Sequence, residues 1–191
     1  MDIVATAIPD VKELLPVRLT DNRGFFSETY NLARFTAAGI TATFVQDNHS
    51  LSYAKYTVRG LHFQLPPFAQ DKLVRVTRGS AFDVALDLRR ASPTFGKSVA
   101  LMLSAERWNQ LFIPVGFAHG YCTLEPNTEV VYKTSTHYVP ESERGILWND
   151  PALDIAWPFP LGEQTVSDRD QAWPVLGEAP IAFGAATGPR S

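Results

Sequence analysis

The sequence predicts an all-β fold, a sandwich or a barrel, on three observations. Residues 81–88 alternate strictly between apolar side chains and a second set that includes Asp83 and Asp87, which is typical of a strand with one buried face. Similar runs recur about every eight to twelve residues with glycine and proline turns between them, as in sandwiches and barrels. Patterns that favour helices are scarce.

Each strand of the central region is bounded by a turn. The predicted strands span residues 73–77, 81–88, 99–103, 111–113, 118–124 and 128–134, and the turns span 78–80, 91–93, 114–116 and 125–127. Gln46 and Asn48 alternate, so they share one face of a further strand, and Tyr132 shares a face with apolar Val130. A core tyrosine and an exposed edge strand are the structural alternatives for these residues.

Only short helices are expected, at the edges of the fold. Asn31 is a suitable N-cap for a helix over residues 31–38 that Gly39 ends, and Ser167 begins a second helix with acidic residues in its first turn. Residues 1–175 are predicted to form a single domain, since no repeat or linker divides them. The tail over residues 176–191 is rich in glycine, alanine and proline, and we expect it to be loosely ordered.

Composition excludes several classes of protein. Charged residues make up 19% of the 191 residues, below the average of about 25%, and aromatic residues make up 12%, so the chain is not disordered. Fourteen prolines argue against coiled coils and long helix bundles. The net charge is −3 and no basic run stands out, so no nucleic-acid partner is expected.

The sequence also indicates a compartment. The only cysteine, Cys122, has no partner within the chain for a disulfide, which suits a reducing environment. The first residues lack the features of a secretory signal, and no apolar stretch approaches the roughly 18 residues of a membrane span. We therefore expect a soluble cytoplasmic protein that does not bind membranes.

Two of the four histidines lie in unusual sequence contexts. His119 ends the pattern P-x-G-x-x-H, which resembles the second motif of the cupin superfamily, whose fold is a double-stranded β-helix or jelly roll. The first cupin metal motif needs H-x-H, because alternate residues of a strand face one side. Here the corresponding residues are His62 and Gln64, and an imidazole with an amide is a poor site for a transition metal. We therefore expect no bound metal.

The segment before His62 presents a difficulty of geometry. Arg59 and His62 are an odd number of residues apart, so an ideal strand would point them to opposite sides. Gly60 lies between them and is a suitable place for a β-bulge that turns one of them toward the other's face.

Taken as a whole, the chain resembles the deoxythymidine-diphosphate (dTDP)-4-dehydrorhamnose 3,5-epimerase family. The resemblance covers residues 1 to about 174, and the combination of motifs is more specific than any one of them. The matching segments are DNRGFFSE (21–28), FVQDNHS (44–50), VRGLHFQ (58–64), QDKLVR (70–75), SPTFG (92–96), IPVGFAHG (113–120), EVVYK (129–133), ILWNDP (146–151) and SDRD (167–170).

The resemblance implies an isomerase that needs no cofactor. Its substrate is dTDP-4-dehydro-6-deoxy-D-glucose, and inversion at C3 and C5 through enolates gives dTDP-4-dehydro-L-rhamnose in nucleotide deoxysugar biosynthesis. It implies that His62 is the base, that Asp170 holds it, and that Tyr132 donates a proton from the opposite face. Lys72 matches the residue that meets the C4 oxygen, where negative charge develops.

The same resemblance implies residues that contact the nucleotide diphosphate or the sugar, and a homodimer with crossed N-terminal strands. The substrate-binding residues are Arg23, Glu28, Gln46, Asn48, Arg59, His119, Glu143 and Arg169. In the family, a bulky aromatic side chain at the position of Tyr138 is associated with binding the inverted sugar, which favours inversion at both carbons.

Three alternatives remain open at this point. The first is a mono-epimerase that inverts only C3 or only C5 of a related nucleotide-linked 4-keto sugar. The second is a metal-dependent cupin enzyme such as a dioxygenase. The third is a non-catalytic jelly roll that binds sugar nucleotides, which would have no use for His62, Tyr132 and Asp170 together.

Overall fold

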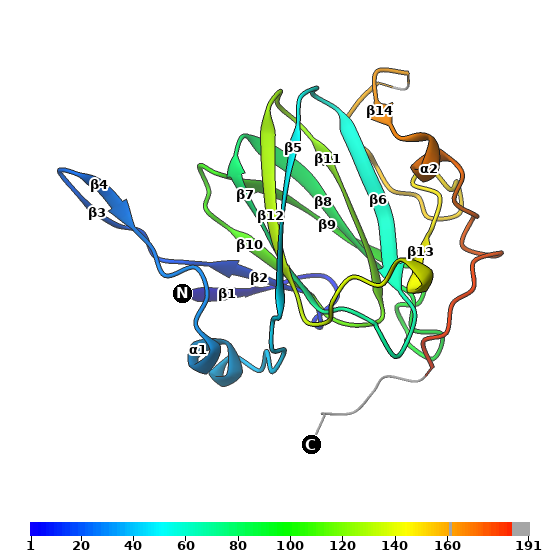
Figure 1. Ribbon diagram of the computed structural model, residues 1–191, viewed down its shortest axis with the longest axis horizontal. Helices are drawn as coiled ribbons and strands as arrows, with labels where there is room; N and C mark the ends of the chain where they lie inside the picture. Colours follow the sequence, from blue (N-terminus) through cyan, green and yellow to red (C-terminus); the bar gives the residue numbers. More distant parts are fainter. Residues whose placement is uncertain (161, 185–191) are drawn as a thin grey trace.

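Two antiparallel sheets pack face to face in the computed structural model, which describes residues 1–160 and 162–184 (Figure 1). In the first sheet the strand order is β1 (Asp2–Ala5), β2 (Lys12–Leu15), β10 (Gln110–Ile113), β7 (Lys72–Arg78), β12 (Thr128–Thr134) and β5 (Gln46–Ser52). In the second the order is β13 (Glu143–Gly145), β6 (Thr57–Gln64), β11 (Phe117–Thr123), β8 (Ser80–Asp87) and β9 (Ser98–Ser104), and β14 (Thr165–Val166) pairs in parallel with β6. This arrangement confirms the predicted all-β jelly roll.

The predicted strands of the central region agree with the observed ones to within one residue at each end. The prediction of a single buried face for residues 81–88 is wrong, because β8 is covered on both sides. Ala81 and Ala85 pack in the core between the sheets, and Val84 and Leu86 pack beneath the chain that runs from Ile146 to Phe183. A carboxylate on the inner face of β8 therefore lies inside the barrel.

Short helices lie at the edges of the barrel, as predicted (Figure 1). At the start of α1 (Leu32–Ala37) the Asn31 side chain accepts a hydrogen bond from the backbone amide of Arg34. At the start of α2 (Asp168–Gln171) the Ser167 side chain accepts one from the backbone amide of Asp170. A 3₁₀ turn, η1 (Pro140–Ser142), precedes β13. Among the described residues no helix is long and apolar enough to cross a membrane.

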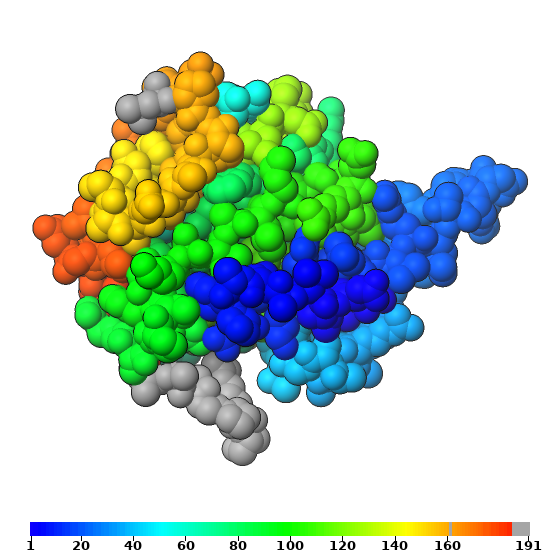
Figure 2. Space-filling view, turned by 180° about the vertical axis from the view of Figure 1, so that it is seen from behind, coloured from blue at the N-terminus to red at the C-terminus, as the bar shows by residue number. Residues whose placement is uncertain are grey.

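The N-terminal hairpin stands away from the barrel. Within the described part of the chain, strands β3 (Leu19–Asp21) and β4 (Gly24–Phe26) pair only with each other. Figures 1 and 2 show them as a projecting arm. Leu19 is 63% exposed and Phe26 is 71% exposed. We call residues 17–28 the N-terminal arm.

The segment that follows residue 175 packs on the outer face of the second sheet. Ala179, Ile181 and Phe183 are buried there in a cluster that includes Leu61 and Leu86. Loose order was expected for residues 176–191, but the packing of these three side chains shows that it does not hold for residues 176–184. Residues 185–191 lie outside the described part of the chain.

Candidate active site

A cavity of about 450 Å³ opens between the two sheets, at the side covered by β13 and α2. Side chains from both sheets and from α2 line it, and most of the predicted site residues are among them. The predicted residues that line the cavity are Gln46, Asn48, Arg59, His62, Lys72, His119, Tyr132, Glu143, Arg169 and Asp170.

His62 and Asp170 form a hydrogen-bonded pair, although they are distant in the sequence. The Nε2 atom of His62 lies 2.6 Å from Oδ1 of Asp170, and the carboxylate also accepts hydrogen bonds from the Gly60 amide and the Trp173 indole, each at 3.2 Å. Burial opposes ionisation of Asp170, but its bonds to His62, Gly60 and Trp173 outweigh burial and lower its pKa. The ionised carboxylate accepts the Nε2 proton and leaves Nδ1 free for a substrate proton.

A bulge in β6 brings Arg59 and His62 to the same cavity, which confirms the role expected for Gly60. His62 is opposite His119 and Arg59 is opposite Tyr121, so β6 has one more residue than β11 over this stretch. Gly60 has a φ of +120°, and a β-carbon there would lie 2.5 Å from the α-carbon of Gly120. Only glycine accommodates both the conformation and the close approach.

A second histidine–carboxylate pair lies deeper in the same cavity. Nε2 of His119 is 3.0 Å from both carboxylate oxygens of Asp83, which has no exposed surface. Burial lowers the pKa of His119, and the charges of Lys72 and His62 add to this, while Asp83 opposes it. Asp83 was missed from the sequence, because the polar face of β8 was not assigned to the barrel interior.

Lys72 lies buried beside these two pairs. It is 8% exposed, and its Nζ donates to the carbonyl of His62 at 3.4 Å. Burial lowers its pKa to about 8, partly offset by the charges of Asp83 and Glu143. A weakly hydrated ammonium group of this kind is a strong electrostatic partner for a developing oxyanion.

Tyr132 lines the cavity from the sheet opposite to His62. It belongs to β12 of the first sheet, whereas His62 belongs to β6 of the second. Burial raises the pKa of Tyr132, and the charge of Glu143 adds to the effect, so the phenol is a protonated donor at neutral pH. A second tyrosine that the sequence did not indicate, Tyr121, is hydrogen-bonded to Ser50 at 2.8 Å, and burial raises its pKa to about 12.

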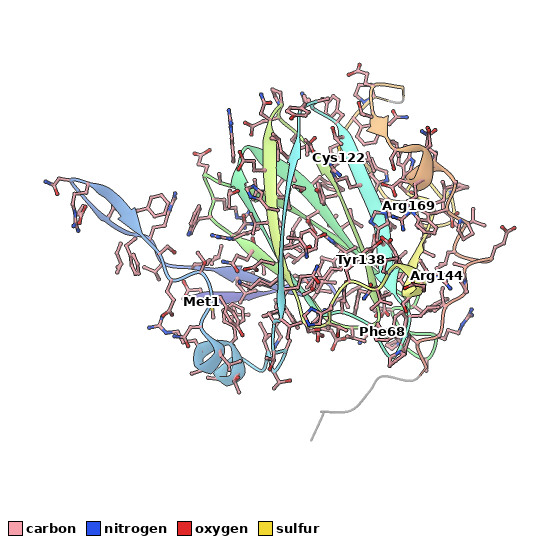
Figure 3. All side chains as sticks on the ribbon, viewed as in Figure 1. Met1, Phe68, Cys122, Tyr138, Arg144 and Arg169 are labelled. Carbon is pink, nitrogen blue, oxygen red and sulfur yellow. The ribbon has the colours of Figure 1, made fainter. Side chains whose placement is uncertain are left out.

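Charged and aromatic side chains meet at the mouth of the cavity. The Tyr138 hydroxyl donates to Oε2 of Glu143 at 2.6 Å, and Arg169 forms an ion pair with the same carboxylate. Figure 3 labels Tyr138 and Arg169 on the side of the barrel where β6, β13 and α2 lie. Gln46 accepts a hydrogen bond from the Tyr138 amide and donates one to Asn48, each at 2.9 Å, which confirms that the two residues share a face.

Two predicted residues lie outside the cavity of their own chain. Arg23 is on the N-terminal arm, paired with Asp21 at 2.6 Å, and Glu28 contacts Asn31 and Arg34 at the base of the arm. The structure therefore brings ten of the twelve predicted residues together and leaves these two apart.

The arrangement suits proton transfer to and from a carbon next to a carbonyl group. An oriented imidazole and a phenol line the cavity from opposite sheets, and a buried ammonium lies beside the backbone carbonyl of the same histidine. Among the described residues, no group of three or more histidine, cysteine or acidic side chains is arranged to hold a metal ion.

Comparisons with known proteins agree with this chemistry. A family model described as dTDP-4-dehydrorhamnose 3,5-epimerase matches residues 5–178. The dTDP-4-dehydrorhamnose 3,5-epimerase of Shigella flexneri is 51% identical over 171 residues, which cover 89% of this chain and 93% of that protein.

Solved structures agree at the level of the fold. The dTDP-6-deoxy-D-glucose-3,5-epimerase of Legionella pneumophila, in complex with dTDP-4-keto-L-rhamnose, has a TM-score of 0.91 and 40% identity, covering 98% of this chain and 99% of that chain. A 3'-monoepimerase from Streptomyces bikiniensis, in complex with dTDP-quinovose, has a TM-score of 0.83 and 31% identity, covering 91% of this chain and 87% of that chain. The chain belongs to the dTDP-4-dehydrorhamnose 3,5-epimerase family.

Proposed function

We propose that this protein is an isomerase that inverts C3 and C5 of dTDP-4-dehydro-6-deoxy-D-glucose to give dTDP-4-dehydro-L-rhamnose. The observation that carries the proposal is the placement of His62, held by Asp170, and Tyr132 on opposite sheets around one cavity. Inversion requires a base on one face of the sugar and a proton donor on the other. Higher identity to the 3,5-epimerases than to the 3'-monoepimerase favours inversion at both carbons.

The proposed reaction proceeds through an enolate at each carbon. Nδ1 of His62 removes the proton from the carbon next to the C4 ketone, and the electron pair moves onto the C4 oxygen. The buried Lys72 ammonium stabilises that oxyanion. Tyr132 then delivers a proton to the opposite face of the same carbon, so the configuration inverts and the oxidation state is unchanged.

The nucleotide is proposed to bind along the mouth of the cavity. Arg59 and Arg169 suit phosphate oxygens, which guanidinium groups bind through two parallel hydrogen bonds. His119, Gln46, Asn48 and Glu143 line the same space with groups that suit sugar hydroxyls. The burial of His119 and its bond to Asp83 leave Nδ1 as the ring nitrogen available to a ligand.

We also propose a homodimer in which the N-terminal arm of one chain reaches the cavity of the other. This accounts for Arg23 and Glu28, whose predicted role is substrate binding although they lie outside their own cavity. Exposed apolar side chains on the arm, Leu19 and Phe26, need a surface to cover them. A single domain over residues 1–175 and a cytoplasmic location, which suits the free thiol of Cys122, complete the proposal.

The test is proton exchange during turnover. The 4-keto sugar nucleotide is incubated with the protein in heavy water, and deuterium at C3 and C5 is followed by NMR. We expect exchange and inversion at both carbons. Exchange at one carbon alone would make the protein a mono-epimerase, and exchange at neither would refute an epimerase.

A further inference from the structure

Side-chain amides hold the loop that carries Tyr138. Residues 135–139, which we call the mouth loop, connect β12 to η1. Gln64, the last residue of β6, donates from Nε2 to the carbonyls of Phe68 at 2.7 Å and His137 at 3.1 Å, and its Oε1 accepts from the Val139 amide at 2.7 Å. Gln64 is only 3% exposed, and Tyr138 lies between the two loop residues that it binds.

Among side chains of this size, a primary amide satisfies the whole set of partners. Two carbonyl groups need two N–H donors, and the Val139 amide needs an acceptor. An ionised glutamate has no donor, and a neutral imidazole has only one. Gln64 occupies the position of the second histidine in the cupin metal motif, but its amide is committed to the backbone of the mouth loop.

Tyr138 is fixed from two further directions. Its backbone amide donates to Gln46 at 2.9 Å, and its hydroxyl donates to Glu143 at 2.6 Å. The side chain lines the cavity, and Tyr138 is 47% exposed at the mouth (Figure 3). Its position therefore depends on contacts from β5, β6 and β13, of which the bonds from Gln64 are the most buried.

We propose that Gln64 is a positioning residue that, through Tyr138, keeps the singly inverted sugar in the cavity until the second carbon is inverted. The inference rests on the proposed function, because only a double inversion has such an intermediate. C3 and C5 lie on opposite sides of the C4 carbonyl, so the single imidazole of His62 serves them in turn and the sugar must move between the two steps. An aromatic ring fixed at the mouth opposes escape during that movement.

Gln64→Glu tests the proposal with little change of size. The variant loses both donors and places a carboxylate against two carbonyl oxygens, so the mouth loop moves and Tyr138 with it. A displacement of about 1 Å changes rates by up to about 10²-fold. We expect the rate of inversion at the second carbon, relative to the first, to fall about tenfold or more, and singly inverted sugar to accumulate in the product.

Gln70→Glu is the matched control. Gln70 also lines the cavity and donates to the mouth loop, but its partner is the Thr136 carbonyl at 2.8 Å, and it does not bind residues 137–139. Because Gln64 still binds residues 137 and 139 on either side of Tyr138 in this variant, we expect the ratio of singly to doubly inverted product to stay close to the wild-type value. A double-mutant cycle with Tyr138→Ala shows whether Gln64 acts through Tyr138, because the two effects on that ratio then fail to add.

The outcomes separate this inference from the proposed function. If the wild-type protein exchanges neither carbon, the proposed function fails. If it inverts both carbons and Gln64→Glu leaves the product ratio unchanged, the positioning role is refuted. If Gln64→Glu does not fold, Gln64→Met replaces it, because methionine has a side chain of similar length without the amide group. If neither variant folds, Gln64 is a purely structural residue and the proposal is overturned.

Discussion

The two histidine–carboxylate pairs of the cavity both join an imidazole to a carboxylate, but they differ in their exposure to solvent. His62 and His119 are opposite each other on β6 and β11, and each is bonded through Nε2 to an aspartate. The His62 side chain is 28% exposed, whereas that of His119 is 6% exposed. Asp170 reaches His62 from outside the barrel, on α2, whereas Asp83 is fully enclosed on β8.

This difference in exposure separates the His62 imidazole, which exchanges a proton with the substrate, from the His119 imidazole, which keeps one protonation state. An accessible imidazole beside an ionised carboxylate is oriented to accept a substrate proton, and its charge is tolerated near solvent. A buried imidazole loses its proton more readily, and the pKa of His119 is lowered by burial accordingly. We therefore assign the role of base to the His62 pair, and a role in binding and structure to the His119 pair.

Removing the His62 side chain is expected to have the largest effect. His62→Ala deletes the base, so inversion at both C3 and C5 falls by on the order of 10²–10⁴-fold. Asp170→Asn leaves the ring but removes the charge that orients it, and it lowers both rates together. Steady-state rates measured by NMR on each carbon check this, and a variant that loses only one carbon would contradict a single base.

Removing the His119 side chain is expected to affect stability more than His62→Ala does. His119→Ala leaves the carboxylate of Asp83 buried without its hydrogen-bond donor, which costs about 1–3 kcal/mol of unfolding free energy. Urea unfolding measures this cost. The double variant His119→Ala with Asp83→Asn removes the stranded charge and is expected to recover part of the loss; no recovery would show that packing alone is responsible.

The state of Lys72 is expected to appear in the pH dependence of turnover. Its pKa of about 8 means that the ammonium is present below pH 8 and is lost as pH rises through that value. kcat/KM should therefore fall on the alkaline side of about pH 8, and Lys72→Arg should move this fall to higher pH, because guanidinium stays charged. An unchanged alkaline limb in Lys72→Arg would exclude Lys72 as its origin.

Lys72 also carries a cost to stability that follows from the same pKa. In the unfolded chain the pKa of a lysine is near its ordinary value of 10.5, whereas the pKa of Lys72 in the fold is about 8, so the fold disfavours the ammonium at pH 7. The cost disappears as pH rises from 8 toward 10.5. Lys72→Met is therefore expected to raise the unfolding free energy at pH 7 by on the order of 1–3 kcal/mol while turnover falls; a lower stability would contradict burial of the charge.

The smallest effect is expected outside both pairs, on the N-terminal arm. Arg23→Ala removes a guanidinium that we propose contacts the substrate bound to the partner chain, so KM is expected to rise about tenfold with little change in kcat. Mixing Arg23→Ala with His62→Ala tests the crossing, because a mixed dimer then keeps one cavity with both groups intact. Part of the activity of the mixture is therefore expected to show the wild-type KM, and a mixture that shows only the raised KM of Arg23→Ala would contradict the exchange of arms.

The sequence predicts the strands and most of the site because these depend on local patterns. The alternation of residues 81–88 and the N-cap of Ser167 are visible in the chain itself. Asp83 was missed because alternation shows that two faces differ without showing which of them is inside, and the segment from Ile146 to Phe183 covers the other face. The bulge at Gly60 was anticipated only because Arg59 and His62 were already candidates.

The roles of Gln64 and Tyr121 also depend on information that the sequence does not contain. Gln64 bonds to residues of the mouth loop more than seventy positions away, and Tyr121 meets Ser50 across the cavity between the two sheets. Such contacts are fixed by the packing of the two sheets, not by neighbours along the chain.

The roles of His62 and Tyr132 are separated by comparing His62→Ala with Tyr132→Phe in heavy water, with deuterium followed at C3 and C5 of the 4-keto sugar nucleotide. We expect no exchange above background in His62→Ala at either carbon. In Tyr132→Phe we expect exchange to persist while inversion is impaired, because the base remains and the opposite donor is gone. Normal exchange and turnover in His62→Ala would contradict the assignment of His62 as the base for both carbons.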